Sequence, residues 1–161
     1  MRASHFPDRA TMAISVRQLT PADIPSLEPL FGAYLDFYRV PRHVAAEREF
    51  LTGRLGADDS TCLGAFLGDE LAGFALCHHS YNSLRVAPAW ILHDLFVASA
   101  QRQRGVASAL IRAVHERAAE AGACEVVLST AHDNTNAQAL YEKLGYGLDT
   151  KFRVYVRDLR S

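Results

Sequence analysis

The sequence predicts an α/β fold in which helices flank a mixed central sheet. Apolar runs of strand length alternate along the chain with segments whose apolar residues recur at helical spacing. A Gly-Asp-Glu tripeptide at 68–70 joins two such runs, as in a β-hairpin. Another run, at 89–97, passes through a basic turn directly into a helical pattern, as is common in α/β domains. With 161 residues, 49% of them hydrophobic, the chain can bury the core of one domain.

In the N-terminal half, capping and breaking residues indicate where elements begin and end. Residues 13–18 alternate as a first strand. Thr20-Pro21-Ala22-Asp23 then supplies an N-cap, a proline at the first helical position and an acid in the first turn. The helix that follows should end near Tyr38, because Pro41 cannot continue it. The other elements expected here are a helix and two strands, at 44–55, 61–67 and 71–79.

In the C-terminal half, a loop over 81–88 leads to a central strand over 89–97. The basic turn opens a helix over 105–121, which Gly122 ends. The last elements expected are a strand, a helix and a final strand, at 124–130, 135–144 and 152–157.

Charge and composition narrow the class of function. Seventeen basic residues against eighteen acidic ones argue against a nucleic-acid-binding protein. No apolar run reaches membrane-spanning length and the N-terminus lacks the apolar centre of a signal peptide, so no membrane association and a cytoplasmic location are expected. Cys62, Cys77 and Cys124 are expected to be reduced thiols, not disulfides or metal ligands. Residues 1–12 are expected to be a flexible extension, and 13–161 a single domain.

The basic turn has the composition of a phosphate-binding loop. Its small residues let the backbone close tightly, so that amide N–H groups at the positive end of a helix converge on an anion. Two arginines add full positive charges beside them. The turn has neither the Gly-Lys-Ser/Thr of a Walker A loop nor a GxGxxG pattern. Its residues are Arg102, Gln103, Arg104, Gly105, Val106 and Ala107.

Two segments together resemble the GCN5-related N-acetyltransferase (GNAT) superfamily. The Arg-x-x-Gly-x-Ala spacing of the turn is similar to the superfamily's loop for the coenzyme A pyrophosphate. An Asn, an Ala three residues on and a Tyr seven residues on, closed by Gly and an aromatic residue, resemble its second signature, and on a helix the first three would share one face. These residues are Asn134, Ala137, Tyr141, Gly145 and Tyr146.

The resemblance implies a mixed, mostly antiparallel central sheet with flanking helices, in which strands four and five splay apart. Acetyl-CoA is the implied cosubstrate, and its pantetheine arm would lie in the opening and bond to unpaired backbone groups of strand four. Those groups belong to Leu95, Phe96 and Val97, while the amides of the turn would hold the pyrophosphate.

Acetyl transfer to an amine needs a base, a polarised carbonyl and a proton for the leaving thiolate. By resemblance Tyr141 is the proton donor, although it could instead only cover the core, and Asn134 bonds the pantetheine or a water, or only caps its helix. Strand four resembles the Hpa2-like and diamine acetyltransferase branch, with His93 in place of the usual Glu before Asp94. The base is therefore His93, Asp94 or a water. Neighbouring residues of a regular strand face opposite sides, so both reach the opening only if a bulge intervenes.

The acceptor is expected to lie against the first two helices and the 81–88 loop. The aromatic-rich segment 33–38, with its carboxylate, suits an ammonium group. Several of its residues also continue the spacing of a buried helical stripe, with Asp36 and Phe37 off it. That stripe comprises Phe31, Tyr34, Leu35 and Tyr38.

The expected function is therefore that of an acyltransferase. The protein would transfer acetyl from acetyl-CoA to a primary amine of a small molecule, such as a polyamine or an amino acid. Direct attack in a ternary complex is expected, because no cysteine has the setting of a nucleophile. The alternative is a non-catalytic acyl-CoA sensor or interaction module on the same fold. A homodimer that pairs through the late strands is also expected.

Overall fold

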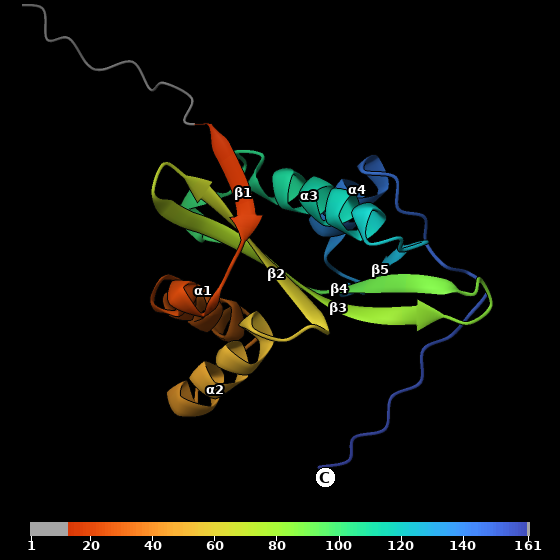
Figure 1. Ribbon diagram of the computed structural model, residues 1–161, viewed down its shortest axis with the longest axis horizontal. Coiled ribbons are helices and arrows are strands. Elements are labelled where there is room, and N and C mark those ends of the chain that lie inside the picture. Colours follow the sequence, from red (N-terminus) through yellow and green to blue (C-terminus); the bar gives the residue numbers. More distant parts are fainter. Residues whose placement is uncertain (1–12, 161) are drawn as a thin grey trace, which may run out of the picture. The chain divides into compact units, whose positions relative to one another are not determined.

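The apolar runs of the first four-fifths of the chain form an open sheet with helices on both faces (Figure 1). The structure is a computed structural model that describes residues 13–160, so the extension expected at 1–12 lies outside the described residues. The described chain divides into two compact units, up to Ser129 and from Thr130, and each is described by itself.

The first unit contains a five-stranded sheet of order β1-β2-β3-β4-β5. Its first four strands are antiparallel neighbours, and β4 and β5 are parallel. The mixed, mostly antiparallel sheet expected from the sequence is therefore confirmed. The strands are β1 (Ile14–Gln18), β2 (Ser60–Leu67), β3 (Glu70–Asn82), β4 (Ala87–Val97) and β5 (Val126–Leu128). The helices are η1 (Pro21–Asp23), α1 (Ile24–Phe37), α2 (Val44–Leu55), η2 (Ser99–Gln101) and α3 (Val106–Glu120).

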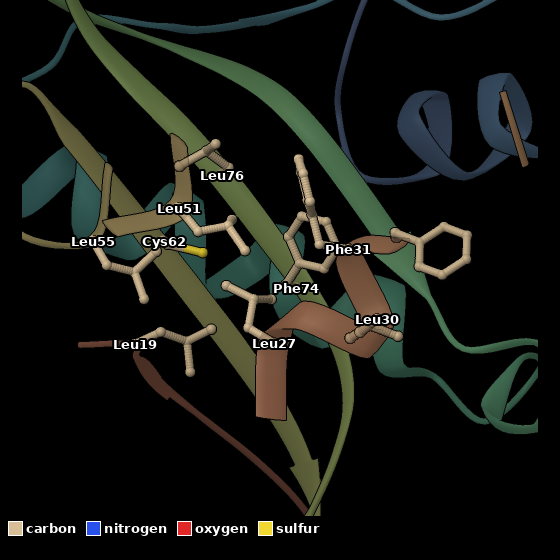
Figure 2. Packing of buried hydrophobic residues seen from close by; sticks show 10 residues of the cluster. Leu19, Leu27, Leu30, Phe31, Leu51, Leu55, Cys62, Phe74 and Leu76 are labelled. Carbon is tan, nitrogen blue, oxygen red and sulfur yellow. The ribbon is translucent and has the colours of Figure 1, made fainter. Parts of the chain in front are cut away.

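One face of the sheet packs against α1 and α2. Figure 2 shows the leucines and Phe31 of the helices meeting Cys62, Phe74 and Leu76 of β2 and β3. The buried members of this cluster are Leu19, Leu27, Leu30, Phe31, Leu51, Leu55, Cys62, Phe74, Leu76 and Phe96. Of the stripe expected on α1, Phe31 is buried and Tyr34 and Leu35 are half-buried, but Tyr38 is 53% exposed.

The other face packs against α3, whose apolar side is fully buried at Val106, Leu110 and Val114. Gly73 of β3 allows the close approach. A Cβ atom there would lie 2.8 Å from the Phe96 carbonyl oxygen and 3.1 Å from Val106 Cγ1.

Strands β4 and β5 pair over three residues and then separate. Trp90, Ile91 and Leu92 are opposite Val126, Val127 and Leu128, and this register ends at Leu92. Beyond it, no strand among residues 13–160 pairs with the β5-side edge of β4. The splay that the resemblance implies is therefore present.

The β3–β4 hairpin is longer than expected. The 81–88 loop shrinks to a turn at 83–86, because the ladder continues through Tyr81↔Pro88 and Asn82↔Ala87. Asn82 Nδ2 also donates to Glu125 Oε1 at 2.6 Å, which ties the hairpin to the start of β5. Residues 81, 82, 87 and 88 extend the ladder through backbone pairing, and the hydrophobic pattern of the sequence does not indicate such pairing.

The second unit contains the helix α4 (Thr135–Lys143). The final strand predicted over 152–157 is wrong, since the described residues after α4 form neither helix nor strand. Val154, Tyr155 and Val156 are 84–90% exposed. Alternating residues make a strand only where a second strand bonds their backbone, and no described residue does so here.

Candidate active site

A β-bulge brings His93 and Asp94 to one face of the sheet. Leu76 of β3 is opposite Asp94 and Cys77 is opposite Leu92, so the register shifts and His93 has no residue opposite it. Cross-strand partners share a face, and Asp94 therefore lies on the face of Leu76, which α1 and α2 cover. His93 is on the same face, because its ring centroid is 5.1 Å from that of His78, two residues beyond Leu76.

The bulge lies where β4 loses its β5 neighbour, since the last parallel pair ends at Leu92. Extra residues of this kind re-aim side chains and end strand pairing. The condition that the sequence left open, a bulge that lets both candidates face the same side, is thus met.

Asp94 is held by a tyrosine from α1. The Tyr34 hydroxyl donates to Asp94 Oδ1 at 2.5 Å in a partly buried setting. The Tyr34 ring packs edge-on against Phe74 and Phe96, with centroids 5.8 and 5.9 Å away. Burial, and next the hydrogen bond to Asp94, raise the pKa of Tyr34 well above its ordinary value. The phenol therefore stays protonated at physiological pH and acts as a donor.

His78 and His93 form an edge-to-face pair beside this carboxylate, with His78 half-buried and His93 exposed. Burial, and next the charge of His93, lower the pKa of His78, while Asp94 acts in the opposite direction. A proton on one imidazole thus disfavours a proton on the other.

The backbone of Leu95, Phe96 and Val97 lies on the part of β4 that faces β3 on one edge only. Alternate residues of a strand point their N–H and C=O groups to its two edges, so this segment presents polar groups to the open side. Arg102 Nε donates to the Val97 carbonyl oxygen at 3.3 Å, and its guanidinium lies 5.7 Å from the Phe37 and Phe96 rings. The Arg102 side chain therefore folds back over the end of β4.

The basic turn presents its backbone to solvent. Gln103 and Gly105 have left-handed backbone, with φ of 59° and 84°, and Gly105 is the N-cap of α3. None of the amides of residues 103–108 donates to a backbone carbonyl of the described chain. The first N–H groups of a helix lack partners within it and carry its positive dipole end, so these amides can hold an anion. Arg104 Nη1 donates to Gln101 Oε1 at 2.5 Å. Val106 is buried and Ala107 half-buried.

In the second unit, Asn134 caps α4. Its Oδ1 accepts from the Ala137 amide at 3.4 Å, so Asn134 is the N-cap residue just before the helix, which is one of the two roles expected from the sequence. Tyr141 is half-buried on α4, with its ring 5.7 Å from that of Tyr146 in an edge-to-face arrangement.

The sequence did not indicate two contacts of His93 and Asp94, which are made by His78 and Tyr34. Tyr34 was expected in the aromatic segment near the acceptor or in a buried stripe, and a phenol in such a stripe needs a hydrogen-bond partner. That partner lies 60 residues away, at Asp94. His78 has no acidic residue at a ligand-like spacing, and its contact with His93 depends on the bulge.

Within residues 13–160, no three His, Cys, Asp or Glu side chains are grouped as metal ligands. None of the helices in this part of the chain has the length and apolar character needed to cross a bilayer.

Comparisons with known proteins agree with this architecture. The sequence model of the Acetyltransferase (GNAT) family matches residues 27–146. The uncharacterized N-acetyltransferase YhfO of Bacillus subtilis (strain 168) is 34% identical over 142 residues, which cover 88% of this chain and 95% of the relative. The D-amino-acid N-acetyltransferase HPA3 of Saccharomyces cerevisiae (strain ATCC 204508 / S288c) is 30% identical over 140 residues, covering 84% and 86%.

A crystal structure described as that of a probable acetyltransferase superposes with a TM-score of 0.85 at 33% identity, covering 90% of this chain and 97% of the other. The family match includes α1, the bulged strand, the basic turn and α4. Since it spans most of the sequence, and relatives above and at 30% identity align over nearly their whole length, this chain belongs to the GNAT family of acetyltransferases.

Proposed function

We propose that the protein transfers the acetyl group of acetyl-CoA to a primary amine of a small molecule, by direct attack in a ternary complex. One observation carries this proposal. The bulge turns His93 and Asp94 to the same face at the point where β4 separates from β5, and β4 leads on to a basic turn in which the amides of residues 103–107 have no backbone acceptor in the described chain. An ionisable pair beside an open strand edge is suited to an amine that must lose a proton and attack a bound thioester.

The residues fit acetyl-CoA as a cosubstrate. The amides of residues 103–107 have no backbone acceptor in the described chain and would bind the pyrophosphate. The open edge of β4 at Leu95, Phe96 and Val97 would bond the pantetheine amides. Asn134 would contribute through its amide group, because the oxygen already caps α4.

The proposed reaction needs a base for the acceptor's proton and a proton donor for the leaving thiolate. The acceptor enters as an ammonium ion and gives one proton to a base, which is His93, Asp94 or a water. Its nitrogen then attacks the thioester carbon, the C–N bond forms and the C–S bond breaks. By the family resemblance, Tyr141 gives its hydroxyl proton to the departing thiolate and recovers a proton from the acylated nitrogen. The products are the acetamide, free coenzyme A and one proton released to solvent.

The acceptor is proposed to be a small amine such as an amino acid or a polyamine. HPA3 is named for D-amino acids, which makes both enantiomers part of the test. The exposed rings of Phe37 and Tyr38 lie at the C-terminal end of α1, and the Tyr38 ring is 5.1 Å from that of Tyr34, whose hydroxyl bonds Asp94. Such surroundings suit a cation.

Thiol release from acetyl-CoA over a panel of amines tests the proposal, with acetylated product detected by mass spectrometry. The panel contains polyamines, D- and L-amino acids, aminoglycosides and lysine peptides, and reactions without an amine measure hydrolysis. We expect amine-dependent release and a product heavier by one acetyl group. Acetyl-CoA binding without any acetylated amine would instead favour the non-catalytic sensor, which none of the relatives described above supports.

A further inference from the structure

His93 and Asp94 can have different roles in the proposed reaction. This inference rests on the proposed function. We infer that Tyr34 is a positioning residue, which fixes the Asp94 carboxylate so that it binds the acceptor's ammonium group and leaves His93 to take the proton. Neither the family match nor the sequence distinguishes His93 from Asp94 as the base.

The first step of the argument is the rigidity of Tyr34. Its ring lies between Phe31 on its own helix and Phe74 and Phe96 on the sheet, with all three centroids within 5.9 Å. Neighbours on α1, β3 and β4 therefore restrict the ring, and this restriction fixes the position of the hydroxyl oxygen. The 2.5 Å bond then orients Asp94 Oδ1.

The second step concerns the hydrogen-bond acceptor sites of Asp94 that Tyr34 does not use. A carboxylate has about four lone-pair sites on two oxygens, and the Tyr34 hydroxyl uses one of them. The remaining oxygen can accept from a bound ammonium group. Asp94 is half-buried, where an ion pair is less screened than on the surface. Its negative charge also acts on the buried Cys62 and Cys77, whose pKa values it helps to raise.

The third step is the surroundings of His93. His93 is exposed, so a proton that it accepts can pass directly to water. The ionisable groups near it are His78 on β3, Asp94 on β4 and Tyr34 on α1. Arg54 at the end of α2 and Asp59 before β2 act on His78 with opposite signs. The proton leaves the ammonium nitrogen for the free imidazole nitrogen of His93, and the neutral amine then attacks.

Tyr34→Phe is the central test, because it removes one oxygen and keeps the ring. With an acceptor identified in the panel, we expect its KM to rise about tenfold, as for loss of a hydrogen bond to a charged group. The kcat should change less than KM, and acetyl-CoA affinity by calorimetry should stay as in the parent. Ser26→Ala, which removes the hydroxyl of an exposed serine near the start of α1, serves as the control and should change neither constant.

A double-mutant cycle shows whether Tyr34 acts through Asp94. Asp94→Asn should raise the acceptor KM at least as much as Tyr34→Phe, and the double variant should resemble Asp94→Asn alone. The pH profile of kcat/KM then separates the roles. Its acidic limb should remain in Tyr34→Phe and Asp94→Asn and disappear in His93→Gln.

Each contrary result has its own meaning. A parent enzyme that acetylates an amine, with a Tyr34→Phe KM equal to that of the parent, overturns the positioning role and leaves the proposed function standing. An acidic limb lost in Asp94→Asn and kept in His93→Gln reverses the two roles. A parent that acetylates no amine overturns the proposed function, and the inference falls with it.

Discussion

Cys62 and Cys77 lie in the sheet at 3% and 0% exposure, and burial raises the pKa of both thiols to about 12. Only a thiolate is an effective nucleophile, and at pH 8 a group with that pKa is ionised in about one molecule in ten thousand. Cys124 is half-buried just before β5. The three thiols therefore differ in accessibility, although the sequence places all of them in apolar runs.

We predict that iodoacetamide at pH 8 modifies Cys124 of the native protein and spares Cys62 and Cys77. In urea all three should react, because the core that protects two of them is lost. Peptide mass spectrometry after timed quenching measures each site. Equal rates at the three cysteines of the folded protein would contradict the protection.

Tyr141→Phe tests the proposed proton donor. Turnover should fall about a hundredfold, the usual contribution of a general acid, while acetyl-CoA affinity stays nearly unchanged. Steady-state rates with a saturating acceptor and calorimetry give the two quantities. Rates within a factor of about two of the parent would make Tyr141 a structural residue.

At the scale of elements, the basic turn depends on a residue in the left-handed region. Gly105 begins α3 at φ 84°, and Gly122 follows the same helix at φ 74°. A side chain at either position is strained by about 1–2 kcal/mol. Only Gly105, however, lies among the amides proposed to hold the pyrophosphate.

We expect Gly105→Ala to lose acetyl-CoA affinity and Gly122→Ala to retain it, with similar losses of stability in both. A Cβ at Gly122 would meet nothing within 4 Å, so the second variant isolates the backbone strain. Calorimetry with acetyl-CoA and thermal unfolding of each variant separate the two effects. If both variants bind acetyl-CoA as the parent does, the turn does not hold the pyrophosphate.

The 3-10 helix η1, which leads directly into α1, begins with a capping box. Asp23 accepts from the Thr20 amide at 2.8 Å and from Arg17 at 2.7 Å. The hydrogen bond from Arg17, and after it the smaller contributions of Thr20, hold the pKa of Asp23 below its usual range. A carboxyl with a lowered folded-state pKa stabilises the fold above its unfolded pKa of about 3.9, and this contribution is lost as the pH falls below that value.

Asp23→Asn should therefore lower the free energy of unfolding by up to about 1 kcal/mol at pH 7, as for the loss of a largely exposed ion pair. The difference from the parent should shrink as the pH falls below about 4. Urea unfolding at a series of pH values measures it. A difference independent of pH would mean that the charge of Asp23 does not contribute.

For the whole molecule, the exposed apolar residues after α4 raise the question of a partner. Phe152, Val154, Tyr155 and Val156 are at least 70% exposed. We propose that two copies pair through this segment, although it does not form the strand expected from its sequence. Removing such side chains from water is favourable at about 25 cal/mol per Å² of apolar surface.

Light scattering at micromolar concentration should then give twice the mass of one chain. Val154→Lys combined with Val156→Lys should return the mass to that of a monomer, because charged side chains resist burial. A monomeric parent at these concentrations would exclude the pairing.

Elements whose signals are local could be read from the sequence. Helices α1, α2, α3 and α4 begin and end within two or three residues of their expected positions, because caps, Pro41 and Gly122 act on the adjacent backbone. The basic turn lies where the sequence placed it, between β4 and α3, and two of its residues, Gln103 and Gly105, have left-handed backbone. The positions of the five strands along the chain follow from their apolar runs.

Tertiary structure decided the parts that join distant residues. The bulge at His93 is a register shift between β3 and β4, and neither strand contains a local signal for it. Tyr34 reaches Asp94 across 60 residues. The segment at 152–157 has the composition of a strand but no paired neighbour among the described residues. In each case the conformation depends on backbone or side-chain partners that only folding brings together, so a sequence pattern can propose the residues but not their pairing.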